Sequence, residues 1–226
     1  HPNFWVATPQ PLPTATGTNR VNWDVRYDAP PAFTHSFAIN ANPGLTPASP
    51  VGGLATPGVY TIKLTVNRKS YTQTAVVAND PRSPATTADV RAQHVLVKKI
   101  QDGMQSAWDG YQQVAAMRTA LNGVTPTDST SDVAKAIRSF RARLDTVGGN
   151  PGGGRGGFGG GRGGGGRTPP PNFVAVHGRL MGQLTTQESG DLAPTEPMLQ
   201  GFAATCRDLT TAVTNWRAMN VKDVPA

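Results

Sequence analysis

The stretch VLVKKIQDGMQSAWDGYQQVAAMRTALN, residues 95–122, decides the predicted fold because its apolar side chains recur at helical spacing. Steps of three and four residues alternate, and Arg118 stands where one further apolar residue is expected. This spacing predicts a long amphipathic helix of a bundle over residues 86–122. Gly103 and Gly110 lie one heptad apart, which predicts a neighbour packed close to the helix backbone. The apolar positions are Val97, Ile100, Met104, Ala107, Tyr111, Val114 and Leu121.

Three further segments carry the same spacing and predict three more helices. One follows TPTDSTSD, residues 125–132, one begins after a glycine-rich tract, and one lies near the C-terminus. Four amphipathic helices with connectors predict an antiparallel helical bundle over residues 86–226. The apolar positions are Val133, Ile137, Phe140, Leu144 and Val147, then Phe173, Val176, Leu180 and Leu184, and finally Leu199, Phe202, Cys206, Leu209, Val213 and Trp216.

Residues 1–85 have the alternating pattern of β-strands, separated by proline-rich connections. In GVYTIKLTVNRKSYTQTAVV, residues 58–77, apolar and polar residues alternate on both sides of a short polar turn, which predicts a β-hairpin. RVNWDVRY (20–27) is a further strand candidate, and AFTHSFAI (32–39) and NFWVA (3–7) are weaker ones. The sequence therefore predicts an α+β protein whose first domain is a partial, half-buried antiparallel β-sandwich of the immunoglobulin or fibronectin III type.

The tract NPGGGRGGFGGGRGGGGRTPPPN, residues 150–172, joins the second predicted helix to the third. We interpret residues 148–171 as a flexible linker within the bundle, and expect residues 150–168 to lack regular structure. The alternative is an RNA-binding segment that uses Arg155, Arg162 and Arg167. Only three arginines are present and no folded RNA-binding motif accompanies them, so the linker is favoured.

The net charge of +7 and the pI near 10 suit an anionic partner: nucleic acid, lipid headgroups or an acidic protein face. No apolar run reaches the roughly 18–20 residues that a membrane-spanning helix needs. The four histidines show no metal-ligand spacing, and the single cysteine, Cys206, falls on a core position of its helix. We therefore predict a protein that is not an enzyme, with no catalytic, cofactor-binding or metal-binding residues.

Four segments carry a resemblance to a known family: RVNWDVRYDAPPAF (20–33), PGVYTIKLTVNRKSYTQTAVVANDPRSPAT (57–86), QDGMQSAWDGYQQV (101–114) and NWRAMNVKDVPA (215–226). They resemble the C-terminal part of exported bacterial BNR-repeat proteins, which are sortilin-like propellers commonly described as glycosyl hydrolases. The resemblance implies a sandwich followed by a helical region, export from the cytoplasm, and a binding or structural role. The propeller of that family is absent from this chain, so no residue here takes over a catalytic role.

The chain also resembles an extrinsic subunit of a bacterial photosynthetic reaction centre and its light-harvesting ring. That resemblance rests on its basic, non-catalytic character and unfinished sheet and on no motif. It implies a periplasmic scaffold, peripheral to the membrane, that contacts protein subunits of a membrane complex and anionic lipid headgroups. The alternatives are an accessory carbohydrate- or protein-binding module detached from a propeller hydrolase, and an RNA-binding protein, which is the less favoured of the two.

The unfinished sheet is expected to recruit its partner through an open edge. We therefore expect residues 1–57 to make the principal contacts, assisted by basic side chains. Trp108 lies off the apolar stripe of its helix, which makes it a candidate for an outward contact, although ordinary core packing is the simpler interpretation. The candidate partner-binding residues are Phe4, Trp5, Arg20, Arg26, Arg68, Lys69 and Trp108.

Overall fold

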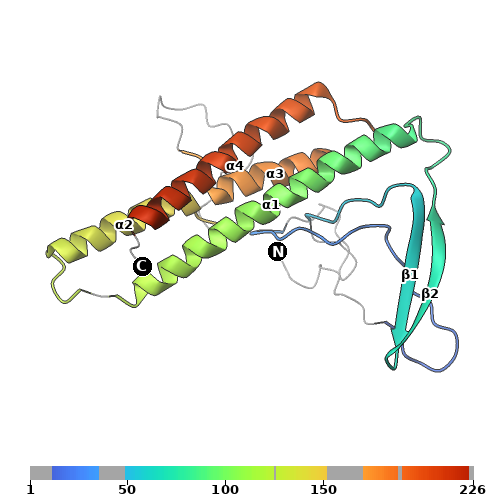
Figure 1. The fold of residues 1–226 in the computed structure, drawn as a ribbon, viewed down its shortest axis with the longest axis horizontal. Coiled ribbons are helices and arrows are strands. Elements are labelled where there is room, and N and C mark those ends of the chain that lie inside the picture. Colours follow the sequence, from blue (N-terminus) through green and yellow to red (C-terminus); the bar gives the residue numbers. More distant parts are fainter. Residues whose placement is uncertain (1–11, 36–48, 125, 152–169, 188–189, 224–226) are drawn as a thin grey trace. The chain divides into compact units, whose positions relative to one another are not determined.

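The computed structural model describes residues 12–35, 49–124, 126–151, 170–187 and 190–223, without the side chains of the last two. Within these residues the chain is a mixed α+β protein with one two-stranded antiparallel sheet and four helices (Figure 1). The elements are β1 (Gly58–Val66), β2 (Lys69–Val77), α1 (Thr87–Asn122), α2 (Asp132–Gly148), α3 (Phe173–Gln187) and α4 (Glu196–Asp223).

The chain divides into two compact units. The first contains the described residues within His1–Pro30, His35–Lys99 and Thr185–Thr195, and includes the β1–β2 hairpin. The second contains the described residues within Pro31–Thr34, Ile100–Leu184 and Glu196–Ala226, which hold most of the helical bundle. The predicted domain boundary between residues 85 and 86 stays a prediction.

The predicted first helix is confirmed over Thr87–Asn122, and its apolar stripe is buried in the manner that the spacing predicts. Met104, Ala107 and Val114 are completely buried. The expected close neighbour of the two glycines is helix α3. A Cβ on Gly110 would lie 2.5 Å from Cζ of Phe173, and one on Gly103 would lie 3.1 Å from Cδ1 of Leu180. Because this pairing runs in opposite directions along the two helices, α3 is antiparallel to α1.

Helix α2 also runs antiparallel to α1, and it lies along the C-terminal part of that helix. Arg118 of α1 pairs with Asp145 (2.8 Å), and Arg141 donates a hydrogen bond to the carbonyl of Leu121 (2.8 Å). Since α3 occupies the stretch of α1 near Gly110, α2 and α3 lie end to end along α1 (Figure 1). The predicted bundle placed four helices side by side. In the structure, α2 and α3 instead follow one another along α1, where a single long helix would otherwise lie.

The two ends of the glycine-rich tract meet where α2 gives way to α3. A Cβ on Gly149 would lie 3.0 Å from Cγ of Asn172. The Gly149 amide donates to the Asp145 carbonyl and ends α2, while Oδ1 of Asn172 accepts a hydrogen bond from the Ala175 amide and begins α3. Residues 150–171 are therefore an insertion between two helices that already stack. The expectation for residues 150–168 falls mostly outside the described residues.

Helix α4 completes the core of the second unit. Its Trp216 is buried and donates a hydrogen bond from Nε1 to Oε1 of Gln113 in α1 (2.8 Å). Toward α3, Gln183 donates to Oγ1 of Thr205 (3.0 Å). The buried cluster is contributed entirely by helices: Val114, Leu144, Val147, Phe173, Ala212, Trp216 and Met219. Cys206, predicted on a core position, is only partly buried.

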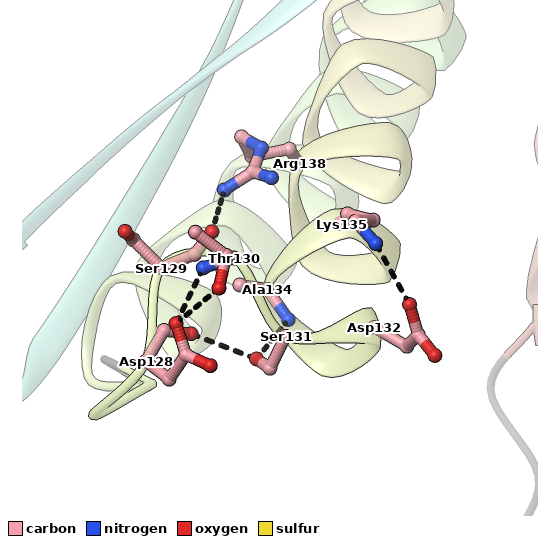
Figure 2. Close-up of polar contacts among 8 residues, drawn as sticks. All are labelled: Asp128, Ser129, Thr130, Ser131, Asp132, Ala134, Lys135 and Arg138. Atoms are coloured by element: carbon pink, nitrogen blue, oxygen red, sulfur yellow. Dashed lines mark hydrogen bonds and ion pairs between the residues drawn. The ribbon is translucent and has the colours of Figure 1, made fainter.

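The start of α2 is fixed by a dense set of polar contacts (Figure 2). Ser131 is the N-cap, and its Oγ accepts a hydrogen bond from the Ala134 amide (3.2 Å). Asp128 accepts hydrogen bonds from the amide and the hydroxyl of Thr130, which lower the pKa of its carboxyl. Arg138 donates to the Ser129 carbonyl from nearly two turns inside the helix. The polar segment TPTDSTSD therefore acts as the predicted start signal.

The predicted sandwich is not shown, because residues 20–27 are irregular and bend at Val25 in place of forming a strand. Oδ1 of Asp24 accepts a hydrogen bond from the Arg26 amide (3.1 Å), and Val25 takes a positive φ of 60°. That backbone conformation ends the extended alternation and leaves a single bridge between Arg26 and Leu54. The candidate strand 3–7 and residues 36–39 of the candidate strand 32–39 lie outside the described residues.

The remaining part of that weak strand candidate, residues 32–35, has no regular structure, and its residues 32–34 belong to the helical unit. The Phe33 ring lies 4.8 Å from Trp108 and 4.7 Å from His177, measured between ring centroids. His177 is buried and donates a hydrogen bond from Nε2 to the Pro31 carbonyl (2.7 Å). Burial lowers the pKa of His177, so its neutral form is favoured.

Gly110→Ala is expected to destabilise the protein by about 1–3 kcal/mol, because the added methyl group would overlap the Phe173 ring. The matched control is Gly178→Ala in α3, where a Cβ would meet nothing within 4 Å. The control is expected to stabilise by about 0.5–1 kcal/mol, since alanine favours the helix. Urea unfolding measures the change in the free energy of unfolding for both variants. A neutral or stabilising effect of Gly110→Ala would contradict the close packing of α1 and α3.

Replacing residues 150–171 by Gly-Ser-Gly-Ser is expected to keep the helical content and to stabilise the bundle by about 1–2 kcal/mol. The reason is that a shorter loop costs less entropy to close once its ends already meet. Circular dichroism and urea unfolding measure the two quantities. A Gly-Ser segment of the original length is the control and should match the natural chain. Loss of cooperative unfolding in the short variant would contradict the interpretation that residues 150–171 are an insertion which the bundle does not need.

Candidate docking surface on the β1–β2 hairpin

Strands β1 and β2 form a regular antiparallel hairpin with a two-residue turn. The register runs from Gly58 opposite Val77 to Val66 opposite Lys69. Both turn residues have positive φ, 50° at Asn67 and 65° at Arg68, which is the geometry of a type I′ turn. The hairpin predicted from the alternation is therefore confirmed, and its turn matches the right-handed twist of the strands.

The register gives the hairpin one apolar face and one polar face, because residues directly opposite each other share a face. We call the first the apolar face; the second is rich in threonine. The apolar face carries Tyr60, Ile62, Leu64, Val66, Tyr71, Ala75 and Val77, together with Gly58, Lys69 and Gln73.

Much of the apolar face is open to solvent. The side chains of Ile62 and Tyr71 are each 52% exposed, and those of Leu64 and Val66 are 50% and 48% exposed. A two-stranded hairpin without a covered face is only marginally stable in water. Soluble proteins rarely leave contiguous apolar patches open unless these patches bind something. The apolar face is therefore the strongest candidate functional surface among the described residues.

The base of the hairpin is held by aromatic and backbone contacts within the same unit. The Tyr60 hydroxyl donates a hydrogen bond to the Thr56 carbonyl (2.7 Å). The Trp23 ring meets Tyr60 edge-on, with centroids 5.5 Å apart and an interplanar angle of 62°. Hydrogen bonding to Tyr60 also raises the pKa of Tyr27. These contacts hold the base of the hairpin in place.

A small cavity of about 210 Å³ lies beside the hairpin base. Pockets for drug-sized ligands usually measure about 300–1,000 Å³, so this one suits a single side chain of a partner better than a cofactor. Its apolar walls come from the turn region near Val25, the hairpin base and α1. The lining residues are Val25, Leu54, Ala55, Pro57, Val77, Ala78, Asn79, Val90, Gln93, His94, Val97, Gln187, Gly190 and Asp191.

Three polar side chains of the cavity, those of Asn79, Gln93 and His94, hold its walls together. Nδ1 of His94 donates a hydrogen bond to the Leu54 carbonyl (3.1 Å), since a carbonyl can only accept. Nε2 of Gln93 donates to the carbonyls of Gln187 and Gly190, the latter at 2.7 Å. Asn79 donates to the Ala85 carbonyl (3.0 Å). No nucleophile and base are paired among these side chains, so the cavity does not have the arrangement of a catalytic site.

Among the predicted partner-binding residues that the structure describes, only two lie together. Arg68 and Lys69 are adjacent at the tip of the hairpin, where Nζ of Lys69 lies 5.3 Å above the Tyr71 ring. Arg26 donates to the Gly52 carbonyl (2.7 Å), and Arg20 is exposed in an irregular segment. The Trp108 ring packs on Phe33 in the helical unit, while residues 4 and 5 (Phe4 and Trp5) lie outside the described residues.

Sequence reasoning missed the exposed apolar residues Ile62, Leu64 and Tyr71 as functional candidates. Their alternation predicted a half-buried sheet. The signal that could have identified them as exposed is that the sequence has too few strand segments to cover this face. Comparison with known proteins adds no family: no family model, curated protein or solved structure matches the chain. In the described residues no helix is long and apolar enough to cross a membrane, and no cluster of three metal-ligating side chains occurs.

Arg68→Gly is expected to stabilise the hairpin by about 1 kcal/mol, because a left-handed backbone conformation is costly for arginine and free for glycine. Slower amide hydrogen exchange in β1 and β2 would register the gain. Lys69→Gly is the control: this neighbouring position belongs to the strand, so glycine there should destabilise by about 0.5–1 kcal/mol. Faster exchange in Arg68→Gly would show that contacts of the arginine side chain outweigh its backbone strain.

Proposed function

We propose that this protein is a non-catalytic, extracytoplasmic structural subunit that docks on a larger membrane protein complex and stabilises it. The observation that carries the proposal is the solvent-open apolar face of the β1–β2 hairpin. The location and the kind of complex, a photosynthetic reaction centre with its light-harvesting proteins, rest on the resemblance of the sequence.

Covering the apolar face would supply a useful part of the binding energy. Fully burying one large apolar side chain contributes about 1.5–3 kcal/mol. Ile62, Leu64, Val66 and Tyr71 are about half exposed, so covering them would contribute about 3–6 kcal/mol before the cost of association. That energy suits a subunit that binds through several contacts.

The edges of the hairpin support the same proposal. The sheet has two strands within the described residues, so β1 and β2 each have one edge without a partner strand there. Unpaired backbone N–H and C=O groups of an edge can pair with an extended segment of another chain. A partner strand would extend the sheet, and its side chains could cover the apolar face at the same time.

The geometry of the exposed aromatic rings favours a protein partner over a carbohydrate. A carbohydrate-binding module needs a flat aromatic platform that faces solvent. Trp23 is 46% exposed, but it meets Tyr60 at 62°, so the two rings do not form a common plane. Tyr27 is tilted by 45° against His94. Neither pair offers the flat surface on which a sugar ring stacks.

Co-purification in mild detergent tests the proposal. We expect the double variant Ile62→Thr, Leu64→Thr to reduce recovery of partner subunits with the tagged protein about tenfold or more, because it removes apolar contact while threonine, which is β-branched, still suits a strand. The matched control is Val59→Thr, Val76→Thr, a cross-strand pair on the polar face that is 71% and 75% exposed. The control should retain the partners. Equal recovery with both variants would contradict docking through the apolar face.

A further inference from the structure

We propose that the hairpin tip, residues 64–71, binds the anionic surface of a phospholipid bilayer. This inference rests on the proposed function, since a subunit docked on a membrane complex lies next to lipid headgroups. It goes further by assigning a ligand to one end of the hairpin: the acidic headgroup layer, with the adjoining apolar side chains at the level of the interface.

The charge of the hairpin is entirely positive. Gly58–Val77 contains Lys63, Arg68 and Lys69 and no carboxylate. Arg68 and Lys69 are neighbours at the turn, so two of the three cations lie at the extreme end of the hairpin. Basic side chains close to an anionic bilayer each strengthen binding by about fivefold. A surface of anionic lipid headgroups is complementary to this tip.

The apolar residues of the tip favour lipid over a purely polar anion. Leu64 and Tyr71 lie directly opposite each other, as do Val66 and Lys69, and all four belong to one face. Leu64, Val66 and Tyr71 are each about half exposed. Tyrosine prefers the headgroup level of a bilayer, and a lysine can keep its ammonium in water while its stem lies on apolar surface. A nucleic acid or an acidic protein loop would use the cations but not this apolar rim.

The backbone at Arg68 supplies an independent argument. Its φ of 65° is the left-handed conformation in which glycine is the favoured residue, and Asn-Gly is the preferred pair for such a turn. A long cationic side chain at this position therefore works against local stability. Strain that persists at an exposed position points to a function of the side chain.

Sedimentation with lipid vesicles tests the proposal directly. The probes are vesicles of phosphatidylcholine alone and of phosphatidylcholine mixed with phosphatidylglycerol. We expect binding to the mixed vesicles only, weakened by added salt, and about 30-fold weaker in the double variant Arg68→Gln, Lys69→Gln. The matched control is Arg207→Gln, Arg217→Gln on exposed positions of α4, which changes the net charge equally and should bind like the natural protein.

A single variant separates function from stability. Arg68→Gly should slow hydrogen exchange in the hairpin and yet bind mixed vesicles about fivefold more weakly. Equal vesicle affinity of the two double variants, equal binding to both kinds of vesicle, or no binding of the natural protein would overturn the proposal. Tip-dependent binding to a single-stranded RNA oligonucleotide without vesicle binding would overturn it in favour of nucleic acid.

The vesicle assay contains no partner protein, and the co-purification assay contains no bilayer. Failure of vesicle binding with intact co-purification would overturn only the lipid contact. Tip-dependent vesicle binding supports the lipid contact whatever the outcome of co-purification, which bears on the protein partner alone.

Discussion

The close contact between the Phe173 ring and the backbone of α1 at Gly110 is the constraint on which the helical unit depends. The ring is fully buried and occupies space that any residue larger than glycine would fill. One heptad away, Leu180 makes the same approach to Gly103. Two such contacts fix the direction and the register of α3 along α1. Asn172, which caps α3, then lies against Gly149 and so determines where α2 must end.

Arg118 completes this junction from the side of α1. Its guanidinium pairs with Asp145 and donates hydrogen bonds to the carbonyls of Leu144 and Gly149. A cation at a helix C-terminus stabilises carbonyls that the helix itself leaves unpaired. The gap in the apolar stripe of α1 is therefore no defect, since the arginine there binds the end of α2. Gly149 and Asn172 lie against each other at this junction, so the contact between α2 and α3 does not depend on the glycine-rich tract.

The helices were predictable from the sequence because their signal is local, whereas the sheet depends on contacts that alternation does not specify. The spacing of apolar residues predicted all four helices. Gly103 and Gly110 predicted that another helix, which is α3, packs close to the backbone of α1. Alternation in residues 58–77 specified which side chains share a face, but not what covers that face. Around Val25 the pattern was misleading, because the Asp24 side chain and a positive φ form a turn there.

The candidate surface was predictable to a similar, partial extent. Arg68 and Lys69 could be found because charge at a polar turn is visible in a sequence. The apolar face could not be recognised as exposed, since Ile62 and Leu64 have the same pattern in a covered sheet and in an open one. The end-to-end stacking of α2 and α3 was not predicted either, because the periodicity of apolar residues does not indicate which helices lie end to end.

The hairpin owes its conformation to its turn and its base, and this leaves the apolar face free for another role. A type I′ turn closes one end, and Tyr60 with Thr56 and Trp23 holds the other. The buried cluster of the bundle is made of helix residues alone, so it does not need the side chains of the apolar face. Substitutions such as Ile62→Thr should therefore alter binding far more than folding. A surface that contributes little to its own fold but remains apolar and basic is best explained by what it contacts, and this is the physical basis of the docking proposal.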